Sequence, residues 1–100
     1  MKLSTFENIA KTKALVQFTS RSYSLELLFL LEEMDGFEGI DNLFSKLVSP
    51  KPKYPAFKAY LYILKDRGCI EILDGKTKNS SKYIKLTSET KKEFTYIFKN

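Results

Sequence analysis

The sequence contains no histidine and only one cysteine, Cys69. Without histidine the chain cannot build a Ser-His-Asp triad or a zinc site of the usual kind. A single cysteine can form neither an internal disulfide nor a thiolate cluster, so we interpret Cys69 as a small packing residue. We predict that the protein is not an enzyme, and we expect no catalytic site, no metal and no cofactor.

Long hydrophobic runs are also missing. The longest one extends from Leu27 to Leu31, whereas a membrane-spanning helix needs roughly 18 apolar residues. The N-terminus, MKLSTFEN, has no apolar segment of the kind found in signal peptides. With 100 residues, 43% hydrophobic and 29% charged, the composition is typical of a single globular domain over residues 1–100. We expect a cytoplasmic protein without a membrane partner.

The net charge of +5 is distributed unevenly. Residues 1–41 hold four basic and seven acidic side chains, whereas residues 42–85 hold ten basic and three acidic ones. A basic segment of this kind favours an anionic partner, most often a nucleic acid. The alternative interpretation is a lysine-rich surface that is simply solvated.

Helical patterns fill the first two thirds of the chain. Apolar spacing predicts helices over residues 4–18, from a cap at Ser22 or Ser24 to about residue 34, and over 40–48 and 55–67. The alternative for ALVQF at 14–18 is a short strand. The second of these helices is apolar on most sides, so we expect it to be the central buried helix. Gly68 stands where a helix C-cap is expected.

The last third of the chain predicts a hairpin and one more helix. CIEIL at 69–73 and KYIKL at 82–86 alternate like strands, and the polar stretch DGKTKNSS joins them. Thr87 can cap a final helix that carries Phe94, Ile97 and Phe98. The predicted fold class is therefore α+β, mainly α with a small β-hairpin.

The segment LYILKDRGCIEI, the polar turn and SKYIKLTSETKKEF resemble the C-terminal half of a winged helix-turn-helix domain of the MarR-like transcription regulators. Leu64 and Gly68 match the end of that family's recognition helix, and Leu86-Thr87 match the start of its next helix. The likeness covers roughly residues 20–98. It implies an N-terminal helix at 1–19, a winged-helix core at 20–86 and a C-terminal helix at 87–100.

Three features depart from the family pattern. The turn SPKPKYP before the recognition helix is long and rich in proline, the chain is short, and Ser88-Glu89-Thr90 replaces the common Glu-Lys-Gly. The resemblance therefore implies the winged helix but not a mode of dimerisation or an effector pocket. The sequence identifies no small-molecule effector and no target DNA sequence.

Resemblance and charge together predict a sequence-specific regulator that binds double-stranded DNA. The recognition helix, at about 54–67, would enter the major groove. The basic wing, at about 74–82, would contact phosphates or the minor groove. The predicted DNA-binding residues are Lys51, Lys53, Tyr54, Lys58, Tyr62, Lys76, Lys78, Asn79, Ser80 and Lys82.

The flanking helices carry more apolar surface than a small core is expected to absorb, which predicts a homodimer. The predicted interface residues are Phe6, Ile9, Phe94, Ile97 and Phe98. The alternative is that these helices close the core of the monomer. Two other functions remain open: a winged-helix protein–protein adaptor subunit of a transcription or replication assembly, and a plasmid- or phage-type replication regulator.

Overall fold

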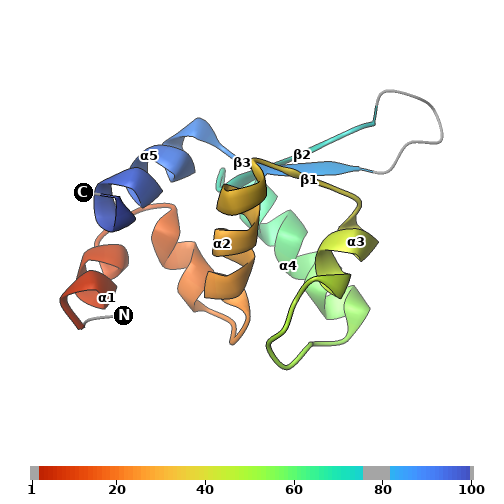
Figure 1. The fold of residues 1–100 in the computed structure, drawn as a ribbon, viewed down its shortest axis with the longest axis horizontal. Coiled ribbons are helices and arrows are strands. Elements are labelled where there is room, and N and C mark those ends of the chain that lie inside the picture. Colours follow the sequence, from red (N-terminus) through yellow and green to blue (C-terminus); the bar gives the residue numbers. More distant parts are fainter. Residues whose placement is uncertain (1–2, 76–81, 100) are drawn as a thin grey trace.

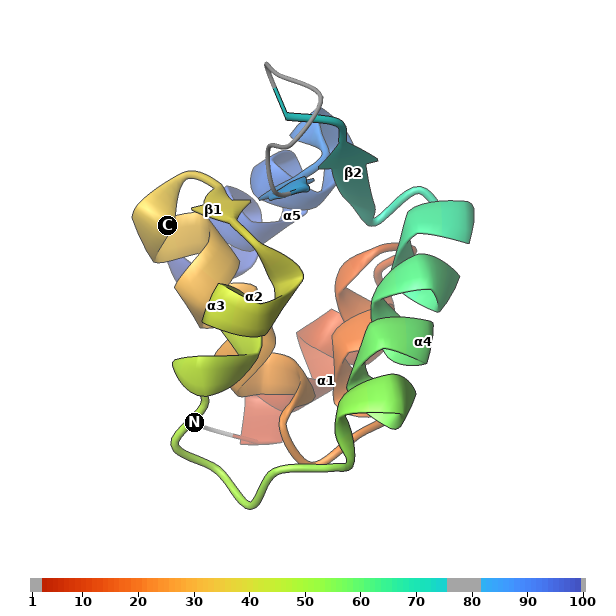
Figure 2. The same cartoon turned by 90° about the vertical axis from the view of Figure 1, so that its right-hand side faces the viewer.

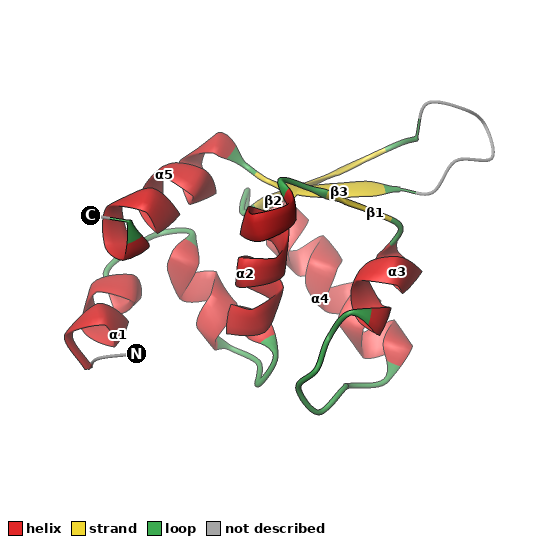
Figure 3. Cartoon of the chain, viewed as in Figure 1, coloured by secondary structure: helices red, strands yellow, loops and turns green. Residues whose placement is uncertain are grey.

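Helices make up most of the chain, and short strands form one small sheet (Figures 1 and 3). The computed structural model describes residues 3–75 and 82–99. Within these ranges the elements are α1 (Leu3–Ala10), the 3₁₀ helix η1 (Leu15–Thr19), α2 (Ser24–Met34), β1 (Phe37–Glu38), α3 (Ile40–Ser45), α4 (Tyr54–Asp66), β2 (Ile70–Leu73), β3 (Tyr83–Leu86) and α5 (Ser88–Phe98). The predicted α+β class, mainly α, is confirmed.

The helix predicted over residues 4–18 is in fact two helices, α1 and η1, with a turn between them. The Thr12 hydroxyl donates a hydrogen bond of 2.6 Å to the carbonyl three residues earlier. A distant side chain then fixes the next turn, because the Glu93 carboxylate accepts from the backbone N–H groups of Ala14 and Leu15 at 3.0 and 3.1 Å. The prediction of one continuous helix was wrong because the path of the chain after Thr12 depends on Glu93. This residue lies on α5, far away in the sequence.

A third strand, β1, was not predicted. It lies between Gly36 and Gly39 and pairs with β3, so that the sheet has the order β1-β3-β2. The φ angle of Gly36 is 116°, and a Cβ at this position would collide with the ring of Tyr83. Glycine is therefore required where α2 turns into the sheet. In the hairpin, the predicted alternation is confirmed, with Ile72 directly opposite Ile84.

The core forms between α2 and α4, with α3, η1 and the sheet around them. Leu27, Leu28 and Leu31 of α2 are fully buried, which confirms α2 as the central helix. Phe57 and Leu61 of α4 are fully buried and belong to the same hydrophobic cluster. Among the described residues, no helix combines the length and the apolar character that crossing a bilayer requires.

The flanking helices close this core. Ile9 of α1 is 0% exposed, and Phe94 of α5 is 3% exposed and packs on Phe29 of α2, with ring centroids 5.4 Å apart. Ile9 and Phe94 were predicted to form a dimer interface, and this is wrong for both, because their side chains are already covered within one chain. Ile97 and Phe98 are partly buried against the same core, while Phe6 is 45% exposed.

The end of α4 and the start of α5 are joined at Cys69. Gly68, with a φ angle of 76°, ends α4, and the Cys69 N–H donates to the Leu64 carbonyl over 2.9 Å. The Cys69 carbonyl accepts from the Thr90 hydroxyl at 2.8 Å, and Thr87 caps α5 by accepting from the Thr90 N–H. Both predicted caps are confirmed. They fix the direction in which the hairpin leaves α4.

Candidate nucleic-acid interface

The exposed side of α4 carries a stripe of aromatic and basic residues. Tyr54, Lys58, Tyr62 and Lys65 recur at helical spacing, whereas Phe57 and its neighbours on the inner side are buried. Helix α4 can begin at Tyr54 because the preceding lysine is extended and a proline occupies the first turn, where no N–H is needed. One face of this helix therefore stabilises the fold, and the other remains free for contacts.

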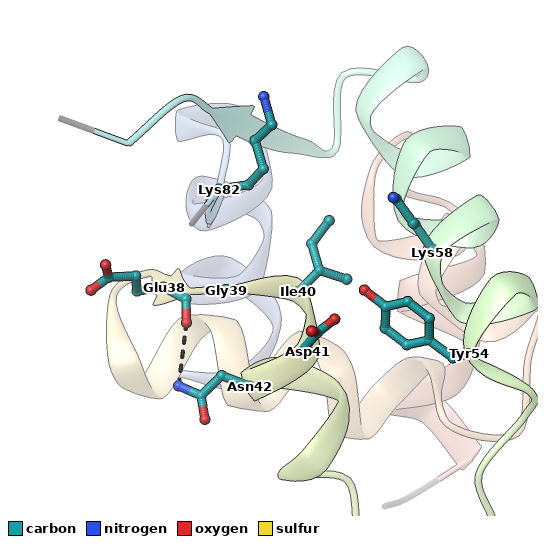
Figure 4. A pocket seen from close by; sticks show the side chains of 8 residues that line it. All are labelled: Glu38, Gly39, Ile40, Asp41, Asn42, Tyr54, Lys58 and Lys82. Atoms are coloured by element: carbon teal, nitrogen blue, oxygen red, sulfur yellow. Dashed lines mark hydrogen bonds between the residues drawn. The ribbon is translucent and has the colours of Figure 1, made fainter. Parts of the chain in front are cut away.

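An open groove lies between α3, the start of α4 and the beginning of β3 (Figure 4). Its volume is about 500 Å³. Figure 2 shows the arrangement from the side, with α3 and α4 next to each other below the hairpin. The structure thus brings three of the predicted DNA-binding residues together. The lining residues are Glu38, Gly39, Ile40, Asp41, Asn42, Tyr54, Lys58 and Lys82.

Contacts with α3 hold Tyr54 in this groove. Its ring lies edge-on to Phe44, with centroids 5.4 Å apart, and Phe44 in turn packs against Phe57 at 5.1 Å. A side-chain hydrogen bond to the Asp41 carboxylate raises the pKa of Tyr54. The phenol therefore stays protonated, and it presents an oriented hydroxyl to the groove.

Lys82 lines the groove from the base of the hairpin, but its side chain extends away from Asp41 and Tyr54 (Figure 4), and its ammonium is paired with Asp74. This hydrogen-bonded ion pair raises the pKa of Lys82 and lowers the pKa of Asp74. Both side chains are well exposed to solvent. The pair is consequently weak, and a phosphate could replace Asp74 as the partner of Lys82.

The other predicted residues of the described chain lie beside the groove. Lys51 and Lys53 are exposed on the loop that enters α4, and the Lys51 ammonium is 5.3 Å from the centroid of the Phe44 ring. Tyr62 lies farther along α4, with the Lys65 ammonium 5.7 Å from its ring centroid. These residues extend the basic and aromatic surface in both directions from the groove.

Four of the predicted DNA-binding residues belong to the tip of the predicted wing. Lys76, Lys78, Asn79 and Ser80 lie outside the described residues. Their contribution to DNA binding stays a prediction from the sequence.

Sequence reasoning missed the acidic and amide side of the groove. Asp41 lies beside Tyr54 at the start of α4, whereas the Glu38 side chain points away from α4 (Figure 4). The Asn42 side-chain amide donates to the Glu38 carbonyl over 3.2 Å. In the sequence, Glu38, Asp41 and Asn42 belong to an acidic stretch that looks merely solvated. Their position in the groove depends on the pairing of β1 with β3, for which two glycines were the only local signal.

Cys69 differs from the residues of this surface because its side chain is buried and neutral. Its side chain is 0% exposed, and burial raises the pKa of its thiol to about 11. At neutral pH the sulfur is protonated and covered, as expected of a packing residue.

No protein-family model matches the chain, and no significant match was found among the curated proteins or the solved structures. The function of the groove must therefore be inferred from the residues that line it.

Proposed function

We propose that the chain is a winged helix-turn-helix protein that binds double-stranded DNA and regulates transcription. In this assignment α3 and α4 form the helix-turn-helix, α4 is the recognition helix, and β2 and β3 form the sides of the wing. The order of helices and strands agrees with such a domain. The basic balance of residues 42–85 agrees with an anionic partner.

The convergence of Tyr54, Lys58 and Lys82 on one open groove is the observation that carries this proposal. The lysines come from two elements, α4 and the base of the wing, and both are exposed. Lysine and tyrosine bind phosphate oxygens, and a lysine can also reach the edge of a guanine. Two elements that present cations on the same side can grip a backbone and a groove together.

The test is equilibrium binding to random duplex DNA across a salt series. If about six phosphates are neutralised, the affinity should fall by about a thousandfold between 50 and 200 mM salt. A double variant, Lys58→Ala with Lys82→Ala, should lower the slope of log affinity against log salt by about 1.8, since each lost phosphate contact contributes about 0.9.

A matched control is Lys11→Ala with Lys92→Ala, which removes the same charge from exposed positions near α1 and on α5. We expect this control to keep most of the slope. Absence of salt-dependent binding by the unaltered protein, or equal losses in the two variants, would contradict the proposed interface.

We further propose that the protein acts as a two-fold homodimer, since a single winged helix covers one half-site. The apolar surface that supports a dimer is smaller than the sequence predicted, and it consists of Phe6 with the partly buried Ile97 and Phe98. Sedimentation at micromolar concentration tests this. The dimer should dissociate in Phe6→Glu, and a monomeric unaltered protein would refute it.

The second candidate is a protein–protein adaptor built on the same fold. Glu38 and Asp41 are lining residues of the groove, and the negative charges of their side chains would repel phosphates there. A change of both to Gln and Asn distinguishes the candidates. DNA in the groove predicts tighter binding by the variant, whereas an unchanged DNA affinity would favour a protein partner at this site.

A further inference from the structure

Glu26, in the first turn of α2, holds the loop that leads into α4. Its carboxylate accepts hydrogen bonds from the backbone N–H groups of Val48 and Ser49, at 2.6 and 3.0 Å. The two bonds use both of its oxygens. These bonds lower the pKa of Glu26, against the opposing effect of burial, so the group is ionised at neutral pH.

The loop has little else to fix it. The Val48 side chain is 91% exposed, and Pro50 and Pro52 have no N–H to donate. Among the described residues, the hydrogen bonds that tie 48–52 to the rest of the chain are those that Glu26 accepts. Charge-assisted bonds of this kind are stronger than neutral ones, so the Glu26 carboxylate is the hydrogen-bonded anchor of this loop.

The loop carries two of the residues assigned to DNA. Lys51 and Lys53 follow the fixed point directly, and Lys53 is the residue from which α4 starts. The Lys51 ammonium already lies above the Phe44 ring, 5.3 Å from its centroid. A fixed loop presents these lysines in one arrangement, whereas a loose loop would have to be ordered when DNA binds.

We propose that Glu26 is a positioning residue for DNA binding: it fixes the loop between α3 and α4 so that Lys51 and Lys53 are preorganised for phosphate contacts. The inference rests on the proposed function. It assigns a role in binding to an acidic residue that cannot itself attract a phosphate.

Charge and positioning predict changes of opposite sign in DNA affinity when Glu26 is replaced by glutamine. Glu26→Gln raises the net charge by one, so simple electrostatics predicts tighter DNA binding. Loss of positioning predicts the opposite, a fall in affinity of about threefold to tenfold, the cost of ordering one or two side chains. Glu33→Gln is the matched control, since it removes the same charge from an exposed position on α2. It should leave the affinity unchanged or slightly increased.

The experiment is a binding cycle with random duplex DNA at fixed salt. Glu26→Gln is measured in the unaltered protein and in a Lys51→Ala/Lys53→Ala background, with circular dichroism to establish that each variant is folded. A fall in affinity that disappears in the lysine-free background supports the proposal. A fall of the same size in both backgrounds, or no fall in the unaltered protein, overturns it.

Amide hydrogen exchange separates this inference from the proposed function. Slow exchange at Val48 and Ser49, lost in Glu26→Gln, would show that the carboxylate fixes the loop. If the loop is fixed but the unaltered protein binds no DNA, the proposed function fails and the role in binding fails with it. If exchange is already fast in the unaltered protein, the positioning role fails on its own, whatever the DNA affinity.

Discussion

Acidic side chains are used differently at the two ends of the molecule. At the end formed by α1, η1 and α5, Glu93 accepts two backbone N–H groups of another element and is partly buried. At the groove between α3 and α4, the lining residues Glu38 and Asp41 are both exposed. Carboxylates therefore stabilise the fold where they accept hydrogen bonds from backbone groups. Where they do not, they stay available to a partner.

Phe57 and Lys58 are neighbours on helix α4 but lie on different faces of it. Substitutions at these two positions should give the largest difference in the free energy of unfolding. Phe57 is 0% exposed and contacts the rings of Tyr23 and Phe44. Phe57→Ala should lower the free energy of unfolding by about 3–5 kcal/mol, because it leaves a cavity. Lys58→Ala should change it by less than about 0.5 kcal/mol, since the side chain is exposed.

Urea denaturation of both variants measures this difference. Similar losses of stability in the two would mean that the outer face of α4 is not free for a partner, which would remove the contrast between its faces.

A second pair of substitutions compares the two ends directly. Glu93→Gln keeps one carbonyl oxygen but loses the charged acceptor shared by Ala14 and Leu15, so we expect a loss of about 1–2 kcal/mol. Glu38→Gln, at the exposed position of β1, should change the free energy of unfolding by no more than about 0.5 kcal/mol. Thermal unfolding of both variants provides the measurement. A larger effect at Glu38 than at Glu93 would reverse the comparison.

The smallest expected effects concern two exposed ion pairs, Lys91 with Asp35 at the helical end and Lys82 with Asp74 at the base of the hairpin. In each pair the lysine lowers the pKa of the aspartate. The sign follows from linkage: both pairs contribute stability above the ordinary aspartate pKa, and this stability is lost as the pH falls through the lowered value.

Carboxyl chemical shifts followed by NMR over an acid titration test this. Lys82→Ala should return the pKa of Asp74 to its usual range and leave Asp35 unchanged, while Lys91→Ala should do the reverse. If either variant shifts both aspartates, the two ends are coupled rather than separate.

Local patterns predicted most of the elements. The apolar spacing around Leu27 and Leu31 predicted the central helix, and Gly68 and Thr87 predicted a helix end and a helix start. These features depend on neighbours within a few residues, so they can be read from the chain. The turn at Thr12 could not be predicted, because the carboxylate that fixes the following residues comes from Glu93.

For the candidate site, the sequence predicted the basic and aromatic side but not its surroundings. Spacing was enough to place Tyr54 and Lys58 on the outer face of α4. The positions of Asp41 beside Tyr54 and of Glu26 beneath the loop depend on contacts between separate elements. Neither residue has a local signature, since an exposed and a positioned carboxylate look alike in a sequence.

Local sequence patterns were thus enough to predict the helices after residue 20, the hairpin, the lack of histidine chemistry and the basic balance of the second half of the chain. Only the tertiary structure decided that Ile9 and Phe94 belong to the core, that Tyr54, Lys58 and Lys82 share a groove, and that Glu26 fixes a loop. The physical reason is the distance along the sequence over which each interaction acts. Helix periodicity and capping act over a few residues, whereas burial and hydrogen bonds to distant backbone groups exist only once the elements have packed together.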